Sequence, residues 1–100
     1  MTVLLLAEWD NPKDETRLKK VNEWESTFMQ RKIEEGIVKK VSQWTDGSGH
    51  IYWIAEFDDI DAYAKVWGEE EFHVKMIRWN RLVDNMSIRL LRPTMSVPLE

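Results

Sequence analysis

Apolar residues alternate along the first ten positions of the chain, which is the pattern of a strand. Thr2 to Trp9 would place Val3, Leu5, Ala7 and Trp9 on one face and Leu4, Leu6 and Glu8 on the other. Large apolar residues at a period of two favour a strand over a helix. Because both faces are largely apolar, we expect this strand to be covered on both sides.

The next apolar positions recur at helical spacing and predict a helix that ends at Gly36. Asn11 is the expected N-cap and Pro12 the first helical residue, with Asp14 and Glu15 in the first turn, where the helix dipole favours carboxylates. The expected buried stripe consists of Leu18, Val21, Trp24 or Glu25, Phe28 and Ile33. One face of this helix is therefore buried and the other is exposed to water.

Two strands, Ile37 to Trp44 and Ile51 to Phe57, flank a short glycine-containing segment and predict a hairpin. The connecting residues are Thr45-Asp46-Gly47-Ser48-Gly49-His50. A glycine-rich phosphate loop would join a strand to a helix and would carry a Lys, and this segment does neither. Its composition is typical of a turn.

A second helical region follows and is expected to divide at Gly68. Asp58 or Asp59 caps a first piece through Ile60, Tyr63, Ala64 and Trp67. The second piece runs from about Glu69 to Val83, and its buried stripe consists of Phe72, Met76, Trp79 and Val83. A last strand extends from Met86 to Leu91, and Arg92-Pro93 ends it.

This order of elements predicts an α+β domain with the ferredoxin-like βαββαβ plan. The four strands form an antiparallel sheet in the order 4-1-3-2, with two helices on one face. Residues 1–98 form the single domain, and Leu99-Glu100 are interpreted as a tag remnant. Because the helices leave the other sheet face bare, a second copy of the sheet is the expected partner, which predicts a homodimer.

Composition narrows the classes of function. A 100-residue chain has a modest core, yet this one carries six Trp and 43% hydrophobic residues, which favours a partner subunit. A net charge of −4 with scattered Lys and Arg argues against nucleic acid and anionic membranes as partners. No Cys is present, which excludes disulfides and thiol chemistry. Val3 to Ala7 is too short for a membrane span, so a cytoplasmic protein is expected.

The chain resembles a known family, through motifs in its second half. A strand that ends at Phe57-Asp58, followed by Asp61-Ala62-Tyr63, Val66-Trp67, Trp79 and Val83-Asp84, resembles the dimeric α+β barrel proteins. These include antibiotic-biosynthesis monooxygenases, ether-degradation proteins, stress-responsive barrels and polyketide cyclases. The resemblance covers the whole chain and is specific for fold rather than activity. It implies a homodimer joined through its sheets and a cavity between sheet and helices for an apolar or aromatic ligand, with no cofactor.

His73 is the candidate catalytic residue, because a histidine on a helix beside such a cavity can act as a general base. Cyclase-like relatives use a histidine on the second helix. This chain departs from them, with Glu71 where they carry proline and Trp67 where they carry tyrosine. The alternatives are a surface histidine beside carboxylates, or a metal ligand paired with Glu70. A single Glu-x-x-His motif is too little for a metal site, so none is expected.

A second candidate site lies on the bare sheet face. Pairing of the first and last strands would bring Glu8 close to Ser87 and Arg89, with Tyr52 and His50 at the same end of the sheet. Such a group could orient a carboxylate or phenol of a ligand. The alternative, which we favour, is a cross-strand ion pair inside the dimer interface. Trp67, with Trp53 and Trp79, is a further candidate for contact with a ligand.

The sequence therefore predicts a cofactor-independent homodimeric barrel that binds, and in its enzymatic version transforms, a small apolar or aromatic carbonyl compound. In that version His73 moves a proton while Glu8, Tyr52 and Arg89 orient the substrate. Two alternatives remain. The same pocket could sequester a lipid-like or aromatic molecule without catalysis, or dimerisation itself could be the function, with the pocket filled by side chains.

Overall fold

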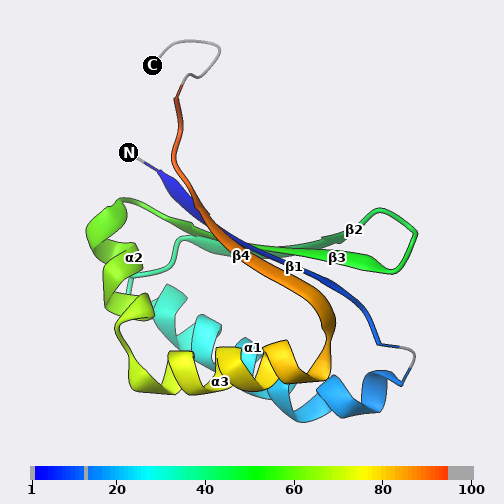
Figure 1. Ribbon diagram of the computed structural model, residues 1–100. Helices are drawn as coiled ribbons and strands as arrows, with labels where there is room; N and C mark the ends of the chain where they lie inside the picture. Colours follow the sequence, from blue (N-terminus) through cyan, green and yellow to red (C-terminus); the bar gives the residue numbers. More distant parts are fainter. Residues whose placement is uncertain (1, 13, 95–100) are drawn as a thin grey trace.

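A four-stranded antiparallel sheet carries all the helices on one face (Figure 1). The computed structural model describes residues 2–12 and 14–94, so the interpretation of Leu99-Glu100 lies outside the described residues. The elements are β1 (Val3–Asp10), the 3-10 helix η1 (Glu15–Leu18), α1 (Lys19–Glu34), β2 (Lys40–Thr45), β3 (His50–Phe57), α2 (Ile60–Trp67), α3 (Glu70–Leu82) and β4 (Asp84–Leu91). The sheet order β2-β3-β1-β4 is the predicted 4-1-3-2 order read from the opposite edge. The ferredoxin-like prediction is confirmed.

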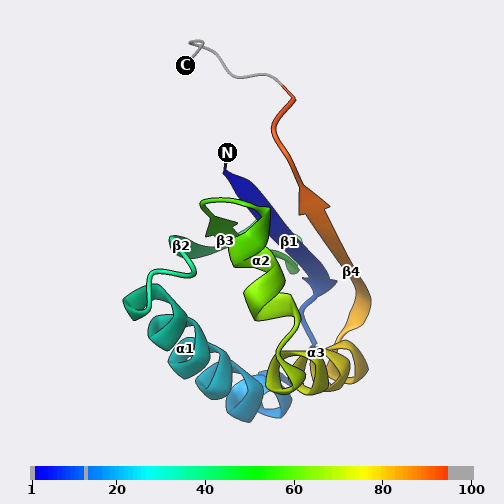
Figure 2. The same ribbon diagram turned by 90° about the vertical axis from the view of Figure 1, so that its left-hand side faces the viewer.

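The two faces of the sheet differ in what covers them. In Figure 1 the helices lie beneath the sheet, with α2 at the end opposite the β2–β3 hairpin, and Figure 2 shows α1 and α3 side by side below it. The burial of β1 alternates accordingly, since Val3, Leu5, Ala7 and Trp9 are at most 3% exposed while the residues between them are half-buried. The face turned away from the helices is uncovered in this single chain.

Aromatic side chains from α1, α3 and the sheet fill the core. Phe28 of α1 stacks on Trp24 at 4.9 Å between ring centroids and lies 5.9 Å from Phe72 of α3. Trp9 of β1 meets Trp79 of α3 edge to face at 5.0 Å. These contacts fix α1 and α3 against each other and against the sheet, since aromatic pairs add to the free energy gained by burying apolar area.

Several helix and strand starts differ from the sequence prediction, including that of the last strand, which begins at Asp84 rather than Met86. The first helix does not begin at Pro12 with Asn11 as cap. Asp14 is the cap instead, because its carboxylate accepts from the Thr16 N–H at 3.1 Å and orders a 3-10 turn ahead of α1. β2 starts at Lys40 rather than Ile37, because the N–H groups of residues 37 and 38 donate back to the Lys32 carbonyl to close α1.

The division of the second helical region at Gly68 is confirmed. Asp59, rather than Asp58, caps α2 by accepting from the Ala62 N–H at 2.9 Å. The N–H of Gly68 closes α2 on the Ala64 carbonyl at 2.9 Å, and α3 begins two residues later. The buried Lys32 of α1 pairs with Glu69 at this junction, so an ion pair holds α1 against the start of α3.

Candidate functional site

A narrow apolar cavity lies between the helices and the sheet. It is lined by Ala7, Trp9, Trp24, Glu25, Met29, Trp53, Phe72, Met76, Trp79 and Met86. The cavity offers about 10 Å³ to an occupant the size of a water molecule, within about 260 Å³ of empty space that is partly open to solvent. The smaller of these volumes suits about one water molecule. A larger occupant needs side chains to move, and the three methionines are unbranched and adapt readily.

Two indole N–H donors in the cavity lining lack hydrogen-bond partners within the described part of the chain. They are Nε1 of Trp9 and Nε1 of Trp79, and both side chains are 3% exposed. A buried donor without an acceptor costs about 1–3 kcal/mol. Such exceptions are rare in folded proteins and call for a physical explanation. A ligand carbonyl oxygen would supply the missing acceptor.

Glu25 is the one acidic residue among those that line the same cavity. It lies on α1, and its Oε1 accepts a hydrogen bond from Nε1 of Trp53 on β3 at 3.0 Å. Burial raises the pKa of the Glu25 carboxyl above its ordinary value, opposed by the hydrogen bond from Trp53. Sequence reasoning placed Glu25 at the edge of a buried stripe and gave it no role. The available signal was a carboxylate within an otherwise apolar stripe.

His73 and Trp67 lie outside this cavity, in an open groove along α3 and β4. The groove is also lined by Met76, Ile77, Asn80, Arg81, Met86 and Ile88. His73 is exposed, and its ring meets Trp67 edge to face at 5.1 Å. Met76 and Met86 line both the groove and the cavity, so these two side chains separate one from the other. The catalytic role of His73 stays a prediction.

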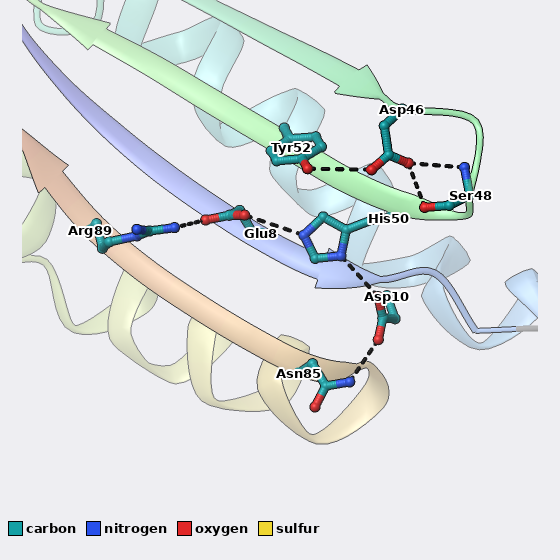
Figure 3. A network of polar contacts seen from close by, with 8 residues as sticks. All are labelled: Glu8, Asp10, Asp46, Ser48, His50, Tyr52, Asn85 and Arg89. Atoms are coloured by element: carbon teal, nitrogen blue, oxygen red, sulfur yellow. Dashed lines mark hydrogen bonds and ion pairs between the residues drawn. The ribbon is translucent and has the colours of Figure 1, made fainter.

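The bare sheet face carries the polar network of Figure 3, on the side of the sheet away from the helices. Glu8 on β1 pairs with Arg89 on β4 and accepts from Nε2 of His50 on β3 at 3.3 Å. Nδ1 of His50 lies 2.8 Å from Oδ1 of Asp10, and its ring meets Tyr52 edge to face at 4.9 Å. The expected convergence of these strands is therefore present. The predicted role of Glu8, His50, Tyr52 and Arg89 in binding a ligand stays a prediction.

Asp10 and Asn85 also belong to this network, and the sequence reasoning did not assign them to it. The amide of Asn85 donates to Oδ2 of Asp10 at 2.7 Å. Asn85 has φ +56°, and the register of β1 and β4 shifts between Glu8 and Asp10. Asn tolerates this left-handed conformation better than most residues. An Asn at the start of a strand was the available signal.

Opposite charges in the network stabilise each other's ionised forms. The hydrogen bond from Arg89 is the main cause that lowers the pKa of Glu8, and the contact with His50 lowers the pKa of Asp10. The same contact with Asp10, followed by that with Glu8, raises the pKa of His50 above its ordinary value. The protonated imidazole is therefore the form that this face favours.

Three other features of the described residues bear on the site. No helix within residues 2–12 and 14–94 has the length and apolar character needed to cross a bilayer. The same residues contain no group of three or more His, Asp or Glu side chains arranged to hold a metal ion. The Gly47-Ser48-Gly49 segment is a hairpin turn, with Gly47 and Gly49 at positive φ.

The chain matches known proteins in structure but not in sequence. No protein-family model and no curated protein sequence matches the chain. SnoaB, a cofactor-independent oxygenase from Streptomyces nogalater, superposes with a TM-score of 0.71 at 14% identity, covering 97% of each chain. A candidate antibiotic biosynthesis monooxygenase from Deinococcus radiodurans gives 0.71 at 12% identity over 98% of each chain.

A dimeric protein of unknown function with a ferredoxin-like fold, from Bacteroides fragilis, gives a TM-score of 0.62 at 15% identity. The match covers 92% of this chain and 96% of that one. At these identities the likeness establishes the fold, over nearly the full length of the chain. The chain therefore has a ferredoxin-like fold, as its sequence pattern predicted.

Proposed function

We propose that this protein is a homodimeric barrel that binds a small aromatic carbonyl compound in the cavity between helices and sheet, and transforms it without a cofactor. The observation that carries the proposal is the pair of buried indole N–H groups without a partner among the described residues, on Trp9 and Trp79, two residues that line an apolar cavity. Ligand sites are typically apolar with a few polar groups that fix orientation. The fold shared with a cofactor-independent oxygenase supports the chemical class.

The carbonyl is the part of the ligand that this cavity would recognise. An indole N–H is a donor and never an acceptor, so its complement is an oxygen with lone pairs. The remaining lining is aromatic and thioether side chains, which favour a flat apolar ring. A compound with one ring and one carbonyl meets both requirements with the smallest displacement of Met29, Met76 and Met86.

The route into the cavity passes the two methionines that separate it from the outer groove. Met76 is 9% exposed and Met86 is half-buried. Rotation of these side chains would connect cavity and groove without moving the backbone, because an unbranched thioether has three rotatable bonds. His73 and Trp67 line the groove, so His73 acts as a proton carrier in this proposal only for a ligand portion that extends past Met76.

The uncovered sheet face is the proposed dimer interface. Its apolar part includes Leu6 and Ile54, which pair at the sheet centre. Its charged part is the network, in which the carboxylates of Glu8 and Asp10 contact Arg89 and His50. A face with both signs of charge can be complementary to a second copy of itself across a two-fold axis. The dimeric description of one structural relative supports this partner. In this proposal the network serves as part of the interface.

A second candidate function is favoured by the small water-accessible space of about 10 Å³. If the methionines do not move, the cavity is filled by its own side chains and the dimer itself is the functional unit. The two proposals differ in ligand binding, which the next experiment measures.

Replacing Trp79 by Phe tests carbonyl recognition. We use 4-methoxyacetophenone and 4-ethylanisole, which differ in that a carbonyl replaces a methylene. The wild type should prefer the carbonyl compound by about tenfold, since a buried donor gains its acceptor. Trp79→Phe and Trp9→Phe should each reduce this preference, and the double variant should abolish it, as measured by calorimetry. The ratio of the two affinities cancels any effect of the enlarged cavity.

Trp44→Phe is the matched control, because Trp44 is 61% exposed and lies outside the cavity. This variant should keep the wild-type preference. A preference that survives in the Trp9→Phe/Trp79→Phe double variant would refute the proposed recognition of the carbonyl. Absence of binding by either compound to the wild type would favour the filled-cavity alternative.

A further inference from the structure

Glu25 occupies a position at which a helix normally buries an apolar residue. It follows Val21 by one helical turn on α1, and its neighbour one turn later, Met29, is 2% exposed and lines the same cavity. Among the described residues that line the cavity, Glu25 is the sole titratable side chain. Burying a carboxylate is unfavourable unless it is hydrogen-bonded. Glu25 is half-buried, and its hydrogen bond with Trp53 offsets part of this cost. It is the group in the lining that can exchange a proton with a ligand.

The hydrogen bond from Trp53 orients the Glu25 carboxylate and uses only part of its capacity to accept hydrogen bonds. One oxygen accepts from Nε1 of Trp53 at 3.0 Å, whereas an ionised carboxylate offers about four acceptor positions on its two oxygens. The bond joins α1 to β3 across the cavity wall, so it restricts the rotamer of Glu25. Accepting capacity remains for a proton or a donor that enters the cavity.

The charged groups around Trp24, which lines the cavity, are engaged in contacts of their own. Glu71 of α3 accepts from Nε1 of Trp24 at 2.6 Å and pairs with Arg31 at 3.5 Å, while Lys75 lies over the Trp24 ring at 5.9 Å. Burial raises the pKa of Glu25 above its ordinary value, against the opposing hydrogen bonds with Trp53 and Ser26. A carboxylate with a raised pKa is a stronger base than an exposed one, and general bases work best when their pKa lies near the working pH.

We infer that Glu25 is the proton acceptor of the cavity, taking the acidic proton of a phenolic or enolic hydroxyl on the bound aromatic carbonyl compound. In this step the ligand O–H bond breaks and an O–H bond forms on the Glu25 carboxyl. The electron pair stays on the ligand, giving a phenolate or enolate. The charge that spreads onto the ligand carbonyl is then stabilised by the indole donors of Trp9 and Trp79.

This inference rests on the proposed function, because it needs a ligand in the cavity, but it adds a residue and a substrate class. The substrate must carry an acidic hydroxyl conjugated with the carbonyl. His73 is less suited to this step, because it is exposed in the outer groove and Met76 and Met86 stand between that groove and the cavity.

The test compares 4-hydroxyacetophenone, which carries the acidic hydroxyl, with 4-methoxyacetophenone, which does not. Glu25→Gln should weaken binding of the hydroxy compound about tenfold or more, since a hydrogen bond to a charged acceptor is lost. It should leave the affinity for the methoxy compound within about twofold. Glu23→Gln, at an exposed position on the same helix, should change neither affinity. Carbonyl ¹³C NMR of Glu25 in the wild type gives an independent readout should the variant fail to fold.

The NMR signal should report protonation of Glu25 when the hydroxy compound binds at neutral pH, and no such change with the methoxy compound. Equal affinities of wild type and Glu25→Gln for the hydroxy compound would overturn this inference and leave the proposed function standing. An unchanged Glu25 signal with the hydroxy compound bound would do the same. If neither compound binds the wild type, the proposed function fails, and the inference fails with it.

Discussion

Replacing Ile54 by Asp should convert the protein from a dimer to a monomer. Ile54 lies on the uncovered sheet face of β3, directly opposite Leu6 of β1 and Ser42 of β2. In the proposed dimer this position is near the middle of the interface, where an unpaired carboxylate must be desolvated and the two-fold axis brings a second one near. The penalty amounts to several kcal/mol, so the dimer dissociation constant should rise at least a hundredfold.

Sedimentation velocity at micromolar concentration measures this change, with circular dichroism to confirm that the variant is folded. Val74→Asp is the matched control, because Val74 is an exposed apolar residue, 44% exposed, on the helical side of the molecule. The control should remain a dimer. A wild type that sediments as a monomer, or an Ile54→Asp variant that dimerises as tightly as the wild type, would rule out the sheet-to-sheet interface.

Replacing Phe28 by Ala should remove a large part of the stability of the domain. Phe28 is 1% exposed, stacks on Trp24, approaches Phe72 and lies under the Lys32 ammonium at 5.2 Å from its ring centroid. Deleting a buried Phe ring costs about 3–5 kcal/mol. A domain of this size has about 5–15 kcal/mol in total, so the variant should be marginally folded.

Urea unfolding followed by circular dichroism gives the free energy of unfolding for both proteins. Val74→Ala serves as the control, since an exposed substitution should alter that free energy by no more than about 0.5 kcal/mol. A loss below about 1 kcal/mol in Phe28→Ala would mean that the ring is not buried between α1 and α3. The cavity would then lack the wall that Phe72 forms, because Phe28 supports Phe72 from behind.

The fold could be predicted because the tertiary structure preserves the local patterns of the sequence. The alternation in β1 marks Val3, Leu5, Ala7 and Trp9 as its buried face, and Gly36 and Gly68 mark the ends of helices that packing leaves unchanged. Strand pairing then brought Glu8, His50 and Arg89 together as expected. These features depend on periodicity and register, both of which are visible in a single sequence.

The candidate cavity could not be predicted from the sequence in the same way. Whether Trp24 or Glu25 faces the core depends on how α1 rotates against β3, and the structure shows both side chains in the lining. Trp9 and Trp79 could be assigned to the core from their spacing, but their lack of acceptors depends on every neighbouring side chain. His73 drew attention because it is the one histidine on a helix, whereas its exposure is set by the rotation of α3.

The central claim is that aromatic carbonyl compounds enter the cavity and meet the indole donors of Trp9 and Trp79. The most direct measurement is the ¹H–¹⁵N spectrum of the tryptophan side chains during titration with 4-methoxyacetophenone. The indole signals of Trp9 and Trp79 should shift downfield as each N–H gains an acceptor, while that of the exposed Trp44 stays in place. Shifts confined to Trp44, or no shift of Trp9 and Trp79 at saturating ligand, would contradict the account.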